Sequence, residues 1–372
     1  MISRRHLLAT APLALSGIGL AGCRRDQAAP RPSGYCFIAN GEGRNLTVVD
    51  LGVFSVAKRI ALEANAAHVV AHPRQPFVYA VSPADGLLTE VSTRSLSVTR
   101  KVNIGAGAQS LHWAHDRQSL WARTANQLVQ VDPSALKPAR RMPLPAAVTG
   151  LDFSPETPQA VASFAGTNEI ALYDLAAGKL ARTFKRPSVG PVCLLKNQLL
   201  AAQPAENLLD IIDNSSGDTV VQLPLAIRPD RFCFSADRGQ LFINGEGSDS
   251  VVVVYPYQTE VAATLLAGRK PGAMAASAFP PYLFVANPFS NSITVIDVLT
   301  QRVIGAVPVG EQPSQIEFTR DQAFALVLNR ASGDLSVLWT QAFSKIVRRD
   351  RNGPMFLMVP VGASPVSAAV TA

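Results

Sequence analysis

Five ionisable side chains stand out in a chain whose extended segments are otherwise largely apolar. They are His68, His112, Asp152, Arg231 and Glu317. Imidazole, carboxylate and guanidinium groups together supply donors, acceptors and both signs of charge, which a site for a polar small ligand needs. If the fold brings the five together, they form such a site. If it does not, they are polar groups satisfied by one another and by trapped water in a wet channel.

Motifs of familiar enzymes and metal proteins are missing from the sequence. There is no C-x-x-C-H run, which covalent c-type haem requires, and no G-x-S-x-G nucleophile elbow. His68 and His72 are four residues apart, but Pro73 follows in an extended context, so they do not form the helical pair of a zinc site. We therefore predict no catalytic residue and no metal site, and we expect a protein that acts by binding. The sequence identifies no cofactor.

The elements that would position these side chains are short strands. Tyr282–Asn287, Ser292–Val298, Gln301–Val309 and Gln315–Phe318 are rich in β-branched and aromatic residues, and Pro, Asn and Gly separate them. Four such strands form one antiparallel sheet. A single sheet of this size leaves a hydrophobic face uncovered, so it needs further copies of itself.

The same cycle recurs along the chain. Pro229, Pro271 and Pro313 follow one another at intervals of 42 residues. A period near 40 with four strands per unit predicts an all-β protein of the β-propeller class. Counting the strand pairs gives eight blades, with seven as the alternative. The predicted pairs are Cys36–Asp50, Phe77–Val91, Leu120–Asp132, Ala160–Asp174, Leu199–Asp213, Leu241–Tyr255, Leu283–Asp297 and Phe324–Leu338.

The two ends of the repeat complement each other. The first unit begins at Tyr35 and has no inner strand before its strand pair, whereas Val359–Val370 parallels Val307–Phe318, which ends in an inner strand. We therefore expect the C-terminal strand from Pro365 to complete the first blade and close the ring. A closed ring leaves no terminal blade open for pairing with another chain.

Alternate positions of the predicted inner strands differ in character. One set is mostly apolar (Leu111, Leu151, Phe232, Met274 and Ile316 among others) and should pack between blades. The other set contains the five ionisable residues and should line the channel. Loops on one face would add a polar rim formed by Glu42, Arg44, Glu246, Asp249, Arg330 and Asp334. Asp residues that recur once per blade, at positions 50, 132, 174, 213 and 297, are predicted to serve the turns.

Four segments resemble the Y-V-T-N signature of YVTN-type β-propeller repeat proteins. They are Phe284–Asn287, Phe37–Asn40, Leu241–Asn244 and Leu326–Asn329. The resemblance implies a propeller but no particular activity, because this fold hosts many. Eight blades, a lipid anchor and channel histidines also resemble the haem-d-binding propellers of cytochrome nitrite reductases and their maturation lipoproteins, which would imply a haem-type cofactor. A propeller lactonase is a weaker alternative, since its acidic and amide metal ligands cannot be singled out.

The N-terminal segment has the pattern of an export signal. Arg4 and Arg5 precede an apolar run from Leu7 to Leu20, and the run ends in Leu-Ala-Gly-Cys23, which resembles a lipobox. We expect residues 1–22 to be a signal peptide, 23–34 a lipidated Cys23 with a flexible tether, and 35–372 the propeller. The start also resembles a twin-arginine signal. Arg24 after the cysteine favours the outer membrane over the inner one.

Composition excludes two classes of protein. With 16% charged and 48% hydrophobic residues the chain is not disordered, and a net charge of +7 spread over this length does not predict nucleic-acid binding. Cys36, Cys193 and Cys233 remain besides Cys23, either as thiols or with a Cys193–Cys233 disulfide. We expect a lipid-anchored scaffold or binding module in the cell envelope, with a protein partner, or alternatively a carrier of a small ligand.

Overall fold

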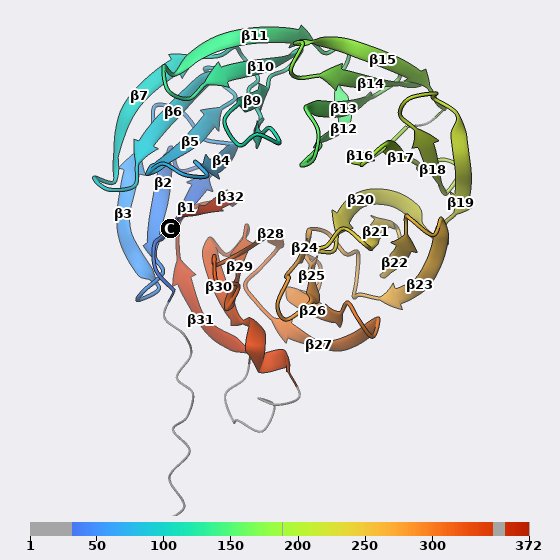
Figure 1. The fold of residues 1–372 in the computed structure, drawn as a ribbon. Coiled ribbons are helices and arrows are strands. Elements are labelled where there is room, and N and C mark those ends of the chain that lie inside the picture. The colour runs from blue at the N-terminus through green and yellow to red at the C-terminus, as the bar shows by residue number, and fades with distance from the viewer. Residues whose placement is uncertain (1–31, 188, 345–353, 372) are drawn as a thin grey trace, which may run out of the picture. The chain divides into compact units, whose positions relative to one another are not determined.

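The computed structural model describes residues 32–187, 189–344 and 354–371, and these form a ring of eight four-stranded antiparallel blades (Figure 1). From inner to outer strand, blade 1 is β32 (Pro365–Val370), β1 (Tyr35–Asn40), β2 (Asn45–Asp50) and β3 (Ser55–Ala61). Blade 2 is β4 (His68–Ala71), β5 (Phe77–Ser82), β6 (Leu87–Ser92) and β7 (Ser97–Asn103). Blade 3 is β8 (Ser110–Trp113), β9 (Leu120–Arg123), β10 (Gln127–Asp132) and β11 (Lys137–Pro143). Blade 4 is β12 (Val148–Phe153), β13 (Gln159–Phe164), β14 (Glu169–Asp174) and β15 (Lys179–Lys185).

The remaining four blades repeat this order. Blade 5 is β16 (Val192–Leu195), β17 (Gln198–Gln203), β18 (Leu208–Asp213) and β19 (Thr219–Pro224). Blade 6 is β20 (Arg228–Phe234), β21 (Leu241–Glu246), β22 (Ser250–Tyr255) and β23 (Glu260–Leu266). Blade 7 is β24 (Met274–Ala276), β25 (Tyr282–Asn287), β26 (Ser292–Asp297) and β27 (Arg302–Pro308). Blade 8 is β28 (Pro313–Phe318), β29 (Phe324–Asn329), β30 (Asp334–Trp339) and β31 (Met355–Pro360), with a short 3-10 turn at Thr340–Phe343.

The predicted closure of the ring is confirmed. β32 pairs antiparallel with β1, with Cys36 opposite Val370 and Ile38 opposite Ala368. Just beyond this ladder, the backbone N–H of Thr371 donates to the carbonyl of Tyr35 at 2.8 Å. Blade 1 is therefore built from both ends of the described chain, and the count of eight blades holds over the alternative of seven.

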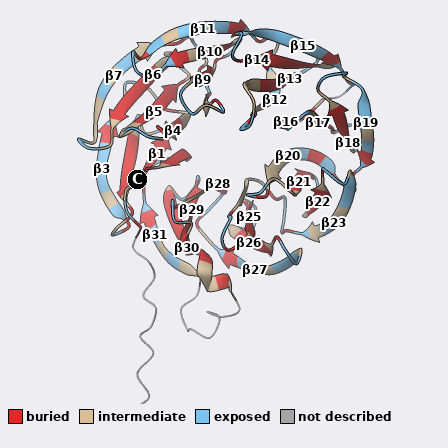
Figure 2. Ribbon diagram, viewed as in Figure 1, coloured by how far each residue is buried: buried red, intermediate tan, exposed pale blue. Residues whose placement is uncertain are grey.

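The core consists of layers between neighbouring blades. Phe37 and Leu46 of blade 1, for example, pack in one cluster with Val69, Val78 and Val91 of blade 2. Figure 2 shows the consequence: the second and third strands are buried almost throughout, whereas the outer strands alternate between exposed and partly covered residues. Since each sheet buries both faces against its neighbours, blade stability depends on the ring.

The repeated Asp and Asn residues satisfy local backbone and side-chain groups. Asp50, which ends β2, accepts the N–H of Gly52 at 2.8 Å, and Asp297 does the same for Leu299 and Thr300. These Asx turns confirm that the recurring Asp residues serve the fold. Asn40, the last residue of a Y-V-T-N-like segment, is fully buried and donates through Nδ2 to three acceptors, including the carbonyl of Val361 in the loop before β32.

Two further expectations can be compared with the structure. Cys36, Cys193 and Cys233 are all unbridged thiols, so the alternative of a Cys193–Cys233 disulfide is wrong. The export signal, the lipidated Cys23 and nearly all of the tether lie outside the described residues. Within the described part of the chain, no helix has the length and apolar character needed to cross a membrane.

Candidate ligand cavity in the channel

The inner strands can be aligned by the register that each makes with its second strand. The first aligned position holds His68, Ser110, Gly150, Pro191, Arg231, Ala273, Gln315 and Ser367. Two residues later, the third position holds Val70, His112, Asp152, Cys193, Cys233, Ala275, Glu317 and Ala369. All five predicted channel residues fall at these two positions.

Polar side chains at these positions bind the next blade. The N–H of Leu111 in blade 3 donates to Nδ1 of His68 in blade 2 at 3.3 Å. The N–H of Leu194 in blade 5 donates to Oδ2 of Asp152 in blade 4 at 2.8 Å, and Gln315 of blade 8 accepts from Ala368 of blade 1. An inner strand is the edge of its sheet, and its outward N–H groups have no ladder partner. A side chain from the preceding blade supplies one.

The expected packing set does lie in the hydrophobic clusters, as Leu111, Phe232 and Ile316 show, but the two sets are not cleanly separated. Members of the first set contact the neighbouring blade, as His68 and Asp152 do. Members of the second set, including Phe232 and Met274, line a cavity of the channel. In a propeller both faces of a blade meet neighbouring blades, so strand alternation does not separate the channel from the interior.

His68 and His112 form a stack at the boundary between blades 2, 3 and 4. The rings of His68 and His112 lie 6.2 Å apart with an interplanar angle of 21°, and the ring of His112 lies 4.7 Å from that of Phe153 at 12°. Burial lowers the pKa of His68 to about 4, and burial together with His68 and Arg123 lowers that of His112 to about 3. Both rings are therefore neutral at neutral pH, and Nε2 of His112 lies 2.9 Å from Oγ of Ser110.

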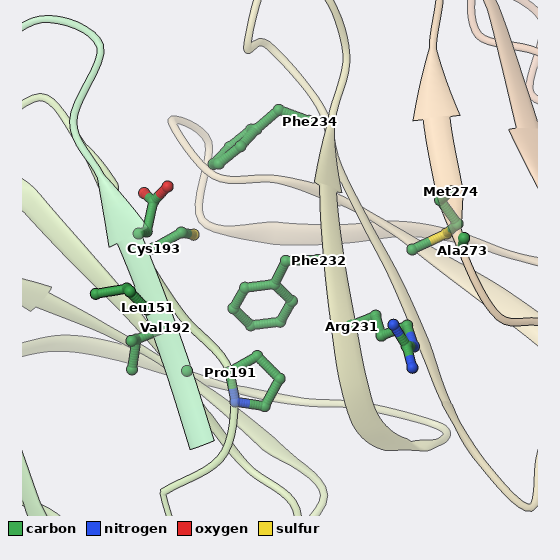
Figure 3. A pocket seen from close by; sticks show the side chains of 11 residues that line it. Leu151, Pro191, Val192, Cys193, Arg231, Phe232, Phe234, Ala273 and Met274 are labelled. Atoms are coloured by element: carbon green, nitrogen blue, oxygen red, sulfur yellow. The ribbon is translucent and has the colours of Figure 1, made fainter. Parts of the chain in front are cut away.

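A cavity of about 390 Å³ opens on the channel beside blades 4 to 7 (Figure 3). Its apolar lining includes Leu151, Val192, Phe232, Phe234 and Met274. In Figure 3, Phe232 lies in the middle, with Leu151 and Val192 on one side and Met274 and Arg231 on the other. The volume falls in the range of small-molecule pockets, and the lining presents polar and apolar surface in similar amounts.

The polar groups of this cavity carry opposite charges. Burial raises the pKa of Asp152 to about 6, against hydrogen bonds from Leu194 and Phe153 and the charge of Arg238, which favour the ionised form. At neutral pH Asp152 is thus an anion with an unusual readiness to accept a proton. Arg231 is exposed, and its Nε lies 3.4 Å from the carboxylate of Asp230. The buried thiol of Cys193 completes the polar lining, with its pKa raised by burial and by Asp152.

The structure distributes the five predicted channel residues over three places. Asp152 and Arg231 line one cavity, and His68 and His112 form the stack. Glu317 accepts a hydrogen bond from Nε2 of Gln315 at 3.1 Å, and burial raises its pKa to about 7. The cavity also contains Cys193 and Phe234. Cys193 was hard to assign from its pattern, because Gly190 and Pro191 obscure the start of its short strand.

The predicted rim residues are likewise dispersed. Glu42 and Arg330 line a second cavity, between blades 8 and 1. The carboxylate of Asp249 accepts the N–H of Lys270 at 3.1 Å, and Arg44 is an exposed turn residue with φ of 45°. Asp334 is buried and accepts a hydrogen bond from Asn329 at 2.6 Å, so it belongs to the blade interior. The side chain of Glu246 lies outside the described parts of the structure.

Among the described residues, no group of three or more His, Cys, Asp or Glu side chains is arranged to hold a metal ion. The thiols of Cys193 and Cys233 are largely surrounded by protein, and burial raises the pKa of each. Both therefore remain protonated at neutral pH, which disfavours them as metal ligands or nucleophiles.

Comparison with known proteins supports the fold. No protein-family model and no curated protein matches this sequence. Many solved structures resemble it, among them the following three. The dihydro-haem d1 dehydrogenase NirN, solved in complex with DHE, has a TM-score of 0.73 and 17% identity over 91% of this chain and 75% of its own. AztD from Citrobacter koseri in its apo form has a TM-score of 0.68 and 13% identity over 91% of this chain and 98% of its own. Hydrazine synthase from Kuenenia stuttgartiensis has a TM-score of 0.57 and 16% identity over 86% of this chain and 99% of its own.

Proposed function

We propose that this propeller acts by binding, and that its ligand is a small amphipathic molecule held in the cavity beside blades 4 to 7. The observation that carries the proposal is the lining of this cavity. Two phenyl rings and a thioether supply apolar contacts, while the half-buried carboxylate of Asp152 and the exposed guanidinium of Arg231 supply polar ones. Such a site selects a ligand by shape and fixes its orientation through a few polar groups.

The geometry favours a ligand with two different polar ends. Its aromatic or aliphatic body would lie against Phe232 and Met274, where removal from water is favourable. An anionic group would face Arg231, whose guanidinium is accessible. A hydrogen-bond donor would face Asp152, which is ionised at neutral pH and already fixed by the N–H of Leu194.

A haem-type cofactor is the competing ligand class, since NirN is a haem d1 enzyme by name. The histidines here do not fit axial ligation. A metal-binding imidazole normally donates its second N–H to an acceptor. Nδ1 of His68 instead accepts the N–H of Leu111, so Nε2 carries the hydrogen. His112 lies between two rings, and neither histidine lines the cavity. If haem nevertheless bound through His112, the His112→Ala variant would lose a coloured complex with haemin.

The N-terminal sequence supports a location for this binding. The lipobox-like Leu-Ala-Gly-Cys23 leads us to place the propeller on the extracytoplasmic side of a bacterial membrane, tethered through lipid on Cys23. The tether would hold the cavity near the membrane without insertion of the ring. A ligand carrier or a scaffold for an envelope protein could both use such an anchor, and the experiment below distinguishes them.

The test uses the fluorescent probe anilinonaphthalene sulfonate, which combines an aromatic body, an N–H donor and an anionic group. We expect saturable binding at one site of the purified protein. Arg231→Gln should weaken it about threefold to fivefold, because an exposed ion pair is worth up to about 1 kcal/mol. Ala273→Leu should abolish it by filling the cavity with apolar volume. The control Arg269→Gln changes the same charge on an exposed arginine that does not line the cavity.

Melting temperatures within a few degrees of the wild type establish that the variants fold. Equal probe binding by all four proteins would overturn the proposal. So would the absence of saturable binding, which would favour the alternative of a scaffold, to be pursued by capture of envelope partners from membranes.

A further inference from the structure

A cationic position recurs on the outer strands of the first three blades. Arg59 on β3, Lys101 on β7 and Arg141 on β11 pair with equivalent residues of the third strand, namely Thr47, Thr89 and Val129. These three cations therefore have the same place in their blades. They differ in whether they have a hydrogen-bond or ion-pair partner within the ring.

Two of the three cations are used inside the ring. Nζ of Lys101 lies 2.5 Å from a carboxylate oxygen of Glu63, in the loop that enters blade 2. Nη1 of Arg141 donates at 3.0 Å both to the carbonyl of Ile104, in the loop that enters blade 3, and to Oε1 of Gln127. In both cases the cation fastens the loop that precedes its own blade.

Arg59 lacks this internal partner. The residue of the preceding loop that corresponds in register to Glu63 is Gly362, which has no side chain to offer. Within the described part of the chain, Arg59 makes no hydrogen bond and no ion pair. Its exposed side chain instead lines a cavity of about 590 Å³ between blades 8 and 1.

The same cavity contains a second arginine and one acid. Nε of Arg330, in the loop after β29, donates to Oγ of Ser364 at 3.0 Å, which fixes the guanidinium while its terminal nitrogens remain available. Ser332 is held in turn, since its Oγ accepts the N–H of Glu311 at 2.8 Å. Glu42, from the loop after β1, lies on the wall and supplies the carboxylate.

We propose that this cavity binds a small zwitterion, a molecule that joins a carboxylate or phosphate to an ammonium group. Two guanidinium groups suit an oxyanion, because their planar N–H donors match carboxylate and phosphate oxygens. The carboxylate of Glu42 repels a ligand that is only anionic and attracts the ammonium end. This site shares no lining residue with the channel cavity, and the inference does not depend on the function proposed for that cavity.

Calorimetric titration tests the site with three probes: O-phosphoethanolamine, β-alanine and inorganic phosphate. We expect the wild-type protein to bind at least one of the two zwitterions, and to bind it more tightly than phosphate. The zwitterion that binds identifies the acid group as phosphate or carboxylate. Arg59→Gln and Arg330→Gln should each weaken binding at least about tenfold, as expected for loss of a charge-assisted hydrogen bond.

Two further variants sharpen the result. Glu42→Gln should reduce the preference for the zwitterion over inorganic phosphate, because it removes the group that recognises ammonium. Lys58→Gln is the matched control, since Lys58 precedes Arg59 on β3, is exposed and does not line the cavity. It should bind as the wild type does. The proposal is overturned if neither zwitterion binds at millimolar concentration, or if Arg59→Gln and Lys58→Gln have the same effect.

Discussion

Oγ of Ser367 accepts the backbone N–H of Val69 at 3.1 Å, and so joins the inner strands of blades 1 and 2. The two residues are separated by 298 positions in the chain. This bond belongs to the series in which a side chain of one inner strand satisfies the edge of the next. At this boundary the donor lies in β4 and the acceptor lies in the strand that closes the ring.

Deletion of residues 365–372 should destabilise the entire propeller. It removes β32, leaves β1 as an unpaired inner edge and exposes the cluster of Phe37 and Val69. We expect a loss well beyond the roughly 0.5–3 kcal/mol of an ordinary substitution. Thermal unfolding followed by circular dichroism measures it. Ser367→Ala, which removes only the bond to Val69, should lose about 1 kcal/mol. An unchanged melting temperature for the deletion would contradict the closure.

Glu317→Gln should stabilise the protein in a pH-dependent way. Burial raises the pKa of Glu317 from 4.5 to about 7, so the native state holds this proton more tightly than the unfolded chain. The favourable contribution is complete below pH 4.5 and is lost as pH rises towards 7. Glutamine resembles the protonated form, so the variant should match the wild type at pH 4 and exceed it above pH 7, by on the order of 3 kcal/mol.

Urea unfolding at a series of pH values measures this difference. Glu206→Gln is the control, since it makes the same substitution at an exposed glutamate in a loop. A difference between Glu317→Gln and the wild type that stays constant from pH 4 to 8 would show that Glu317 ionises as readily in the native state as in the unfolded chain.

His112→Phe should stabilise the protein relative to the wild type at low pH, whereas Glu317→Gln does so at high pH. The pKa of His112 is lowered to about 3, so the native state excludes a proton that the unfolded chain binds below pH 6.5. The stability that neutral His112 provides is therefore present above pH 6.5 and lost as pH falls. A phenyl ring keeps the stack on Phe153 and cannot be protonated. As pH falls from 7.5 to 4.5, the free energy of unfolding of the variant should rise by about 2–3 kcal/mol relative to that of the wild type.

The same urea titrations test this prediction. Only the change of the difference with pH is diagnostic, because a phenyl ring also alters packing by a fixed amount. If the gap between His112→Phe and the wild type did not widen below pH 6.5, the imidazole would have to be protonated in the folded ring.

Cys23→Ser should release the protein from the membrane. If lipid on Cys23 is the anchor, the wild type sediments with membranes and partitions into detergent, whereas the variant is recovered in the soluble fraction. Mass spectrometry of the wild type should show a diacylated N-terminal cysteine after loss of residues 1–22. Membrane association of Cys23→Ser equal to that of the wild type would mean that something other than this cysteine holds the protein there.

The fold could be predicted because its information is local and repeated. Strand propensity, turn residues and the 42-residue interval of Pro229, Pro271 and Pro313 each recur, and agreement among repeats averages out individual errors. Ring closure followed from the likeness of Val359–Val370 to an internal unit. The disulfide alternative failed because spacing along a sequence does not show whether two thiols face each other across blades.

The site was less predictable because it depends on contacts between blades. The search for polar departures from the repeat singled out Asp152 and Arg231, which line one cavity. The alternation rule could not tell whether a side chain faces open channel or the edge of the next strand, which is why His68 and Glu317 lie elsewhere. Arg59 could not be singled out from the sequence. It differs from Lys101 because Gly362 stands where a partner such as Glu63 would be, and this is seen only in the register of the strands.

The shared first blade also fixes an order of events during synthesis. β1 is made before every other strand of the ring and β32 after all of them, so the apolar edge of β1 has no partner while seven blades are produced. Blades 2 to 8 can form as they emerge, but the ring can close only after translation of β32. If the protein is exported as the N-terminal sequence predicts, a pathway that accepts folded proteins must wait for the finished chain. A pathway that threads unfolded chains postpones closure until β1 and β32 meet on the far side of the membrane.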